Sequence, residues 1–162
     1  MKSKFTFKSY FVLIMSIILA CLIIFIIPAF FDKPYYDDKI FPKLFLPSIL
    51  TFTLIYLVIG EIRTKCIIVE ININKIKVKR FLGIINNEYN PSEITGWKYS
   101  HLSSRGGTYE YLYLYSNNRK VIKISEFYHK NYLDLKNKIE KDFKFLGYEE
   151  FSLKDEFIEI FK

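Results

Sequence analysis

The sequence predicts a membrane α-hairpin followed by a soluble α+β domain, in which an antiparallel sheet or partly open barrel is capped by one C-terminal helix. Three observations lead to this prediction. Long apolar stretches without charge fill most of the chain before residue 61. Short runs after residue 65 alternate apolar and polar residues with a period of two, as strands do. After residue 125 apolar residues recur every three or four positions, as in an amphipathic helix.

The apolar stretches are long enough to cross a membrane. Residues 10–31 and residues 44–60 carry no charged side chain. A helix rises about 1.5 Å per residue, so the first stretch crosses the roughly 30 Å hydrocarbon core with some tilt. The second stretch is at the short end of the range, and a Lys43 side chain that reaches toward the interface extends it. We therefore predict spans at about residues 10–31 and 42–60, within a unit of residues 1–61.

The charges that flank the spans predict their orientation. Lys2, Lys4 and Lys8 precede the first span, and a further basic group follows the second, whereas aspartates offset the lysines of the intervening loop. Short segments rich in Lys and Arg stay in the cytoplasm. The sequence thus predicts a protein of the cytoplasmic (inner) membrane with both termini cytoplasmic. A cleaved signal peptide is disfavoured, because the first apolar run is too long and no Ala-x-Ala site follows it.

The residues after the hairpin predict an antiparallel meander and one helix. The strand-like runs, separated by turns, are residues 66–71, 75–81, 85–89, 94–102, 109–115 and 120–124. The helix has Ser125 as its N-cap and Gly147 as a left-handed C-terminal cap. Its apolar stripe is Tyr128, Tyr132, Leu135, Ile139, Phe143 and Leu146. We expect residues 62–147 to fold without the hairpin, and the tail 148–162 to be either an added edge strand or a short helix.

This order of elements resembles the bacterial pleckstrin-homology-like (PH-like) domain membrane proteins that carry a two-helix N-terminal anchor. The resemblance covers residues 61–147. It rests on the hairpin CIIVEI–KIKVKRF, the transition from Pro91 to Gly96, the strand YEYLYLY, and KVIKIS before the helix from Tyr128 to Leu146. The family fold has seven strands, whereas six runs precede the helix here. The resemblance implies a cytoplasmic PH-like domain held at the membrane surface.

A group of basic residues is one candidate for contact with lipid or a partner. Lys75, Lys77 and Lys79 share one face of a predicted strand, and Arg80 lies beside them. Such a group suits binding to anionic lipid head groups, because each basic residue near the membrane surface contributes about 1 kcal/mol of binding free energy. It also fits the solvated face of a strand, or a sheet edge that lysines protect against aggregation.

A row of tyrosines is the second candidate. Tyr109, Tyr111, Tyr113 and Tyr115 fall on one face of a single predicted strand. They form either an aromatic binding surface or a half-buried sheet face that packs on its neighbours. In the second case the alternating Leu112 and Leu114 hold the core.

No residue pattern indicates catalysis or a bound cofactor. The loop Ser104-Arg105-Gly106-Gly107 lacks the Lys-Ser/Thr pair and the following helix of a phosphate-binding loop. His101 and His129 have no sequence-local partners, and no metal-ligand spacing involves them. Cys21 and Cys66 are isolated, and we expect both to be small buried residues. We therefore predict neither catalytic residues nor a metal or cofactor site.

The charge distribution argues against nucleic acid as a partner. The net charge of +7 is spread along the chain without a basic stripe or an RNA-binding aromatic signature. The sequence thus predicts a non-enzymatic, membrane-anchored PH-like interaction module that binds a protein partner, a copy of itself or the anionic lipid surface. The alternative is an accessory subunit of a transport or envelope-stress complex, in which the hairpin contacts the partners.

Overall fold

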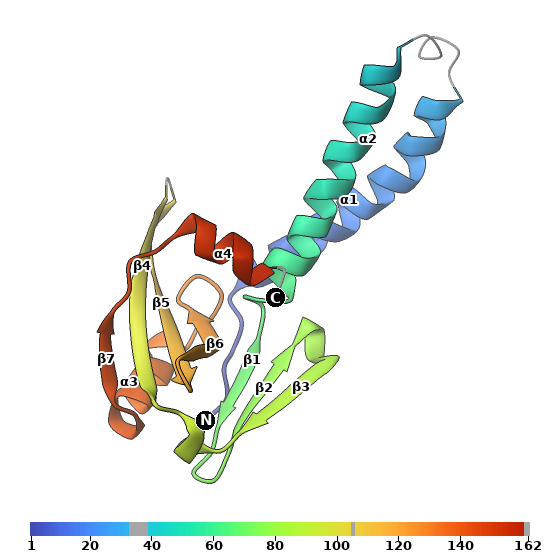
Figure 1. Cartoon of the computed structure of the whole chain (residues 1–162). Helices are drawn as coiled ribbons and strands as arrows, with labels where there is room; N and C mark the ends of the chain where they lie inside the picture. The colour runs from blue at the N-terminus through green and yellow to red at the C-terminus, as the bar shows by residue number, and fades with distance from the viewer. Residues whose placement is uncertain (33–38, 105, 161–162) are drawn as a thin grey trace.

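The structure is a computed structural model that describes residues 1–32, 39–104 and 106–160. It consists of a helical hairpin and a sheet region at the base of that hairpin (Figure 1). Helices α1 (Phe7–Phe31) and α2 (Ile40–Ile55) pack together, and α2 continues into the π-helical turn η2 (Tyr56–Ile62). Both α1 and the continuous helix Ile40–Ile62 are long and apolar enough to cross a membrane, with mean hydropathies of 3.2 and 1.9. The predicted helices are therefore confirmed, and each begins a few residues earlier than expected.

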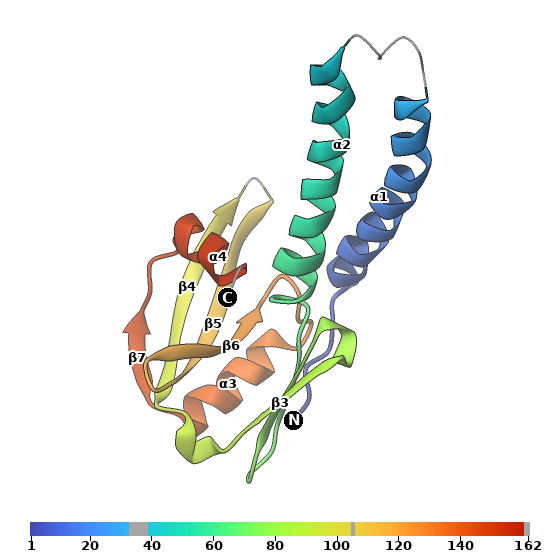
Figure 2. The ribbon, with the colours of Figure 1, turned by 45° about the vertical axis from the view of Figure 1, so that its right-hand side comes forward.

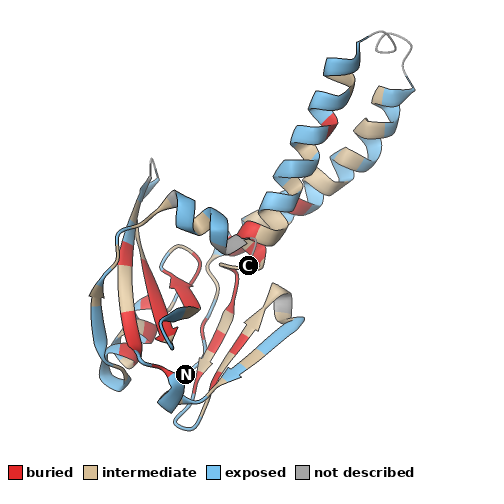
Figure 3. Ribbon diagram, in the orientation of Figure 1, coloured by how far each residue is buried: buried red, intermediate tan, exposed pale blue. Residues whose placement is uncertain are grey.

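The surface of the hairpin suits a lipid environment. Large apolar side chains such as Phe11, Phe25 and Phe52 are exposed on its outside (Figure 3). The buried residues of α1 and α2 are Ser9, Ser16 and Pro47. Ser9 is buried against the sheet region, where its hydroxyl donates to the Tyr128 carbonyl at 2.9 Å, and the Ser16 hydroxyl donates to the Val12 carbonyl of its own helix. Cys21 is exposed on α1, so the expectation that both cysteines are buried holds for Cys66 alone.

The strands form two open sheets. The first has the order β1-β2-β3 and contains β1 (Ile68–Ile71), β2 (Ile76–Arg80) and β3 (Ile85–Tyr89), all antiparallel. The second has the order β6-β5-β4-β7 and contains β4 (Gly96–Ser104), β5 (Gly107–Ser116), β6 (Arg119–Ser125) and β7 (Phe145–Tyr148). Short 3-10 turns, η3 (Phe81–Gly83) and η4 (Pro91–Glu93), join β2 to β3 and β3 to β4. The six predicted strands are present and pair antiparallel, but they form two open sheets in place of one continuous meander, and the second sheet is mixed because β7 runs parallel to β4.

The chain changes sheets after η4. Asn90 and Glu93 form a capping box around this turn, which fixes the end of β3. Gly96 then has a φ of +155°, and a Cβ there would overlap the carbonyl oxygen of Lys144. Because a side chain at this position would block β7, only glycine allows β4 to start beside it.

The helix after the sheets is shorter than predicted. α3 covers Tyr132–Asp142, and Phe143 is already in extended conformation. β7 follows and pairs in parallel with β4, where Trp97 N–H donates to the Lys144 carbonyl at 2.9 Å. Gly147 has a φ of +110° within β7, so it does not cap the helix. The tail holds a second helix, α4 (Leu153–Ile160), which agrees with the short-helix alternative.

One core joins both sheets and α3. It contains Tyr132, Leu135 and Ile139 of the helix, together with inward-facing residues of both sheets. Those sheet residues include Ile71, Ile76 and Val78 of the first sheet and Leu112, Leu114, Ile122 and Ile124 of the second. The buried residues line the inner faces of the sheets (Figure 3). The prediction that the helix packs its apolar stripe on the strands is confirmed for these three positions.

The first six residues lie with the sheet region, although they precede the hairpin in sequence. The Met1 amine donates to the Ile71 carbonyl at 2.6 Å, and Ile71 N–H donates back to the Met1 carbonyl at 2.7 Å. Ser3 N–H donates to the Val69 carbonyl at 2.8 Å, while its Oγ accepts from Val69 N–H at 2.9 Å. In this N-terminal segment (residues 1–6), the first three residues thus run antiparallel along β1, and the next three pair with the backbone around His129. Hydrogen bonds therefore cross the predicted boundary at residue 61.

Candidate interaction surfaces

The predicted lysine face lies on the central strand of the first sheet. Lys75 and Lys77 both pair with Glu88 of β3, with Nζ–Oε distances of 3.5 and 3.1 Å. Hydrogen bonding to Glu88 raises the pKa of Lys77. Because β2 has a neighbour on each side, the interpretation as a protected sheet edge is wrong. Ion pairing across neighbouring strands favours a solvated sheet face here.

The two remaining members of the lysine group differ in their surroundings. Lys79 lies opposite Ile68 and Asn86 in the ladders of its neighbouring strands. The Arg80 guanidinium donates to the Val121 carbonyl of β6 and so links the two sheets. Arg80 therefore has a structural contact, whereas the lysines line the outside of the first sheet.

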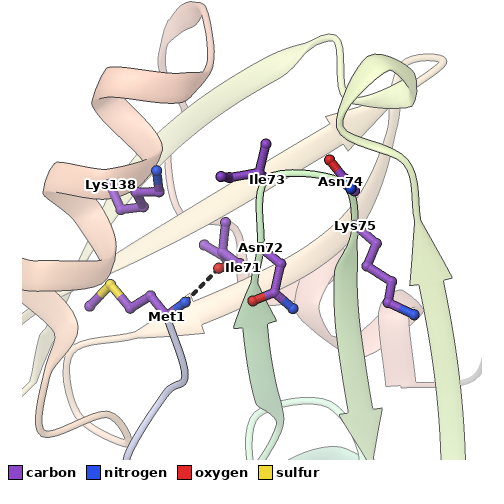
Figure 4. Close-up of a pocket in the computed structure, with 7 residues that line it drawn as sticks. All are labelled: Met1, Ile71, Asn72, Ile73, Asn74, Lys75 and Lys138. Carbon is purple, nitrogen blue, oxygen red and sulfur yellow. Dashed lines mark hydrogen bonds between the residues drawn. The ribbon is translucent and has the colours of Figure 1, made fainter.

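An open hollow of about 460 Å³ lies at the turn between β1 and β2 (Figure 4). Its lining comprises Met1, Ile71, Asn72, Ile73, Asn74, Lys75 and Lys138. The Lys138 ammonium pairs with Asp142 at 3.0 Å, and Lys75 pairs with Glu88. Carboxylates thus offset both lysines, and the third positive group of the lining, the Met1 amine, donates to the Ile71 carbonyl.

The tyrosine row is buried for most of its length. Tyr111, Tyr113 and Tyr115 form a cluster on one face of β5, and Leu112 and Leu114 hold the core on the other. This arrangement agrees with the sheet-face alternative. Tyr109 is half-buried near the start of α1, where the Lys8 ammonium lies 3.1 Å from its hydroxyl.

Lysines and the tail cover the tyrosine face. The ammonium groups of Lys98, Lys120 and Lys123 lie over the rings of Tyr115, Tyr113 and Tyr111, at 5.0, 4.3 and 5.1 Å from the ring centroids. These distances fit cation–π attraction. Glu149 of the tail accepts a hydrogen bond from the Tyr115 hydroxyl and pairs with Lys120 at 2.5 Å.

The charge of Glu149 is stabilised by its partners. Burial opposes its ionisation, but the contacts with Lys120 and Tyr115 outweigh burial and lower the pKa of Glu149. The Phe151 ring then lies 6.3 Å from that of Tyr111. Sequence reasoning missed this cover, because Glu149 and Glu156 stand among other acidic residues of the tail and their lysine partners are distant in sequence.

A charged junction joins the base of the hairpin to the sheet region. Lys65 Nζ lies 2.7 Å from Glu61 Oε1 of η2 and 3.8 Å from Glu156 Oε2 of α4. Glu156 also pairs with Lys123 of β6, and the Tyr128 hydroxyl donates to Glu61 at 2.5 Å. All four charged side chains are largely buried. We call Glu61, Lys65, Lys123 and Glu156 the junction network.

Within the junction network, Lys65 keeps its charge despite burial. Burial disfavours the charge of Lys65, yet the nearby carboxylate of Glu61 outweighs it and raises the pKa of Lys65. The adjacent Cys66 behaves differently, because burial raises the pKa of its thiol to about 12. Cys66 is therefore a protonated, unreactive side chain at neutral pH.

His129 is a buried structural residue next to this junction. Its Nε2 lies 2.9 Å from the Ile67 carbonyl, and Ser125 N–H lies 3.3 Å from its Nδ1. Nδ1 also lies 2.9 Å from the Ser125 carbonyl oxygen, so a neutral ring donates to one of the two carbonyls and its tautomer decides which. Burial lowers the pKa of His129. Phe5 of the N-terminal segment packs against the ring, with centroids 5.8 Å apart.

An exposed aromatic group lies at the edge of the second sheet. Phe145 and Tyr148 of β7 are 51% and 53% exposed. Tyr99 of β4 contacts both rings, at centroid distances of 5.9 and 5.4 Å, and His101 lies 6.0 Å from Tyr148. We call Tyr99, His101, Phe145 and Tyr148 the aromatic edge. Because β7 is the last strand of its sheet, its outer backbone edge is unpaired within that sheet.

The aromatic edge was missed because the sequence pattern places residues 143–146 in a helix. Aromatic residues at a strand edge are typical of protein-binding surfaces.

Across the described ranges, no group of three or more His, Cys, Asp and Glu side chains is arranged to hold a metal. Comparisons of the chain with protein-family models, with curated proteins and with solved structures gave no match.

Proposed function

We propose that this chain is a non-enzymatic, membrane-anchored interaction module whose sheet region binds a protein partner through the aromatic edge. The observation that carries the proposal is the ring cluster of the aromatic edge, in which Phe145 and Tyr148 of the edge strand β7 are about half exposed beside Tyr99 and His101 of β4. Exposed aromatic clusters on soluble surfaces are uncommon, and binding hot spots are rich in such rings. The lysine face and the tyrosine row fit this role less well, because carboxylates pair with the former and the tail covers the latter.

The hairpin supplies the anchor in this proposal. Its exposed apolar surface and its length suit a bilayer. The junction network and the N-terminal segment then hold the sheet region at the base of the hairpin. The partner would therefore meet the aromatic edge in a fixed position relative to the membrane.

Two further parts of the proposal rest on sequence. The basic flanks support cytoplasmic termini in a bacterial inner membrane. A PH-like ancestry is supported by two packed sheets and a helix after β6. Against it, the seventh strand here follows the helix and runs parallel to β4.

A labelling experiment tests the orientation. Tyr36→Cys and Asn118→Cys are introduced separately into a Cys21→Ser background and treated with a membrane-impermeant maleimide on intact cells. We expect labelling at position 36 alone, because the basic flanks keep position 118 inside. Labelling at 118 from outside would reverse the proposed orientation.

Photo-cross-linking tests the partner site. A benzoylphenylalanine replaces Tyr148 in the full chain, and a matched probe replaces Leu133, which is also exposed but lies on α3. We expect a discrete adduct from position 148, lost when Phe145→Ser is added, and none from position 133. An adduct of twice the chain mass would identify a second copy as the partner. Equal adducts from both positions, or adducts only from probes in the hairpin, would reject the aromatic edge as the site.

A further inference from the structure

Helix α4 turns the Glu156 carboxylate toward the protein and leaves Phe157 and Ile158 exposed, next to the exposed Lys154 and Asp155. The Glu156 side chain is 14% exposed. By contrast, the neighbouring Phe157 and Ile158 are 47% and 41% exposed. A helix on the surface of a soluble protein shows the opposite order, with apolar residues inward and charged residues outward. The environment of α4 therefore differs from plain water on its outer side.

The inner side of α4 is fixed by ion pairs. Glu156 lies between Lys65 and Lys123, and these pairs tie α4 to the segment after η2 and to β6. With Glu156 held inward, the helical period places Phe157 and Ile158 on the outer surface. The exposed Lys154 lies on the same face, three residues before Phe157 and four before Ile158.

The position of α4 identifies what lies on its outer side. α4 contacts η2, the turn that ends the apolar helix Ile40–Ile62. Both views place α4 beside the base of the hairpin, at the end of the sheet region nearest to it (Figures 1 and 2). A hairpin that crosses the bilayer leaves it at this level. In that arrangement the outer face of α4 would lie beside the end of the apolar hairpin, at the level of η2.

We propose that α4 is an interfacial helix whose Phe157 and Ile158 insert into the boundary between head groups and acyl chains, beside the hairpin. The inference rests on the proposed membrane anchor and adds a contact that the hairpin alone does not provide. Aromatic and aliphatic side chains at this depth, with a lysine that reaches the phosphates, are typical of such helices. The contact would fix the tilt of the sheet region against the membrane surface.

Tryptophan fluorescence tests the inference. The chain has one tryptophan, Trp97, so Trp97→Phe gives a dark background. Phe157→Trp, Phe25→Trp and Ile73→Trp are made separately in it and reconstituted as full chains in phosphatidylcholine vesicles, with and without brominated acyl chains. Phe25 lies in the hairpin, and Ile73 is 90% exposed in the β1–β2 turn, far from the hairpin (Figure 1).

We expect tryptophan at positions 25 and 157 to show blue-shifted emission and about twofold quenching by the brominated lipid, and tryptophan at 73 to show neither. Quenching at 25 without quenching at 157 would overturn the interfacial helix and leave the anchor standing. A blue shift at 157 without lipid quenching would mean that protein covers this face, which also overturns the inference. Loss of quenching at 25 would instead reject the membrane anchor itself. If Trp97→Phe does not fold, the same variants are compared with Trp97 retained and its emission subtracted.

Discussion

At the scale of single residues, His129 shows how a titratable group becomes part of the scaffold. Its ring joins the carbonyl of Ile67 to the backbone of Ser125, 62 and 4 residues away in sequence. The ring is enclosed by Phe5 and by the start of the first sheet. Nothing around it in the sequence indicates these contacts. A histidine of this kind affects stability rather than catalysis.

Burial of His129 predicts a loss of stability in mild acid. Burial lowers its pKa in the folded state below the ordinary value of about 6.5, so the unfolded chain binds the proton more readily. Stability is then complete above about pH 7 and decreases as the pH falls below 6.5 toward the folded-state pKa. We expect the melting temperature of the full chain to fall between pH 7.5 and 5.5.

The variant His129→Gln provides the control for this pH dependence. Its amide N–H can still donate to the Ile67 carbonyl, but the side chain does not titrate. We expect a lower melting temperature than the parent at pH 7.5 and a smaller change down to pH 5.5. Parallel curves for the two proteins would assign the pH dependence to another group.

Replacement of Lys65 should lower the stability of the fold, because Glu61 and Glu156 then stay largely buried without this positively charged partner. Loss of one partner from a buried ion pair costs about 3–5 kcal/mol, and we expect Lys65→Met to lie near the lower end because these groups retain some solvent contact. Denaturant unfolding in detergent measures the change. Lys75→Met, which breaks an exposed pair with Glu88, should barely alter stability. Similar midpoints for both variants would show that the junction network does not stabilise the fold.

At the scale of elements, α3 provides a matched comparison. Leu135 is fully buried (0% exposed), while Leu133 on the same helix is 68% exposed. Truncation of a buried Leu removes its burial energy and leaves a cavity, at a total cost of about 2–5 kcal/mol. Leu135→Ala should therefore lower the melting temperature strongly and Leu133→Ala hardly at all. Comparable shifts would mean that α3 does not hold the core.

The elements also show which features a sequence can reveal. The strands from 66 to 124 were predicted because each has its own alternation and its own turn. The end of α3 was not, because Phe143 and Leu146 continue a helical spacing and Gly147 looks like a helix cap. What decides the outcome is the backbone of β4, nearly fifty residues earlier, which pairs with residues 145–148. Local pattern contains no information about such a partner.

The aromatic edge could not be predicted for the same reason. Its rings come from β4 and β7, so the group exists only after these strands have paired. The Lys–Glu pairs on the first sheet also depend on register, which places Glu88 opposite Lys77. The sequence pattern identified the group of lysines, but it did not indicate that Glu88 would lie close enough to pair with them.

At the scale of the whole molecule, the N-terminal segment makes the two parts of the chain interdependent. The sequence predicts that a chain beginning at residue 63 folds alone. Such a chain lacks residues 1–6, which hydrogen-bond to β1 and pack on His129. It also lacks Glu61, the nearest partner of Lys65. We expect residues 63–162 to melt at a much lower temperature than the full chain, or without cooperativity.

A shortened chain tests whether the missing contacts cause this loss of stability. In it, residues 1–6 are joined through a flexible linker directly to residue 61. This shortened chain regains the pairing with β1 and the carboxylate of Glu61 while lacking both apolar helices. We expect it to recover a cooperative transition by circular dichroism. Failure to recover, with a stable full chain, would show that the hairpin helices themselves support the sheets.

The pairing of residues 1–6 with β1 also has a consequence for biosynthesis. The ribosome completes Val69 long after Ser3, and the hairpin is made in between. Translation proceeds at about 5–20 residues per second, so the first residues wait for several seconds before their partner strand emerges. Once the hairpin crosses a bilayer twice, both segments lie on the same side and the sheet can close. A nascent chain whose second helix failed to insert would separate them across the membrane, so pairing of the first residues with β1 requires correct insertion.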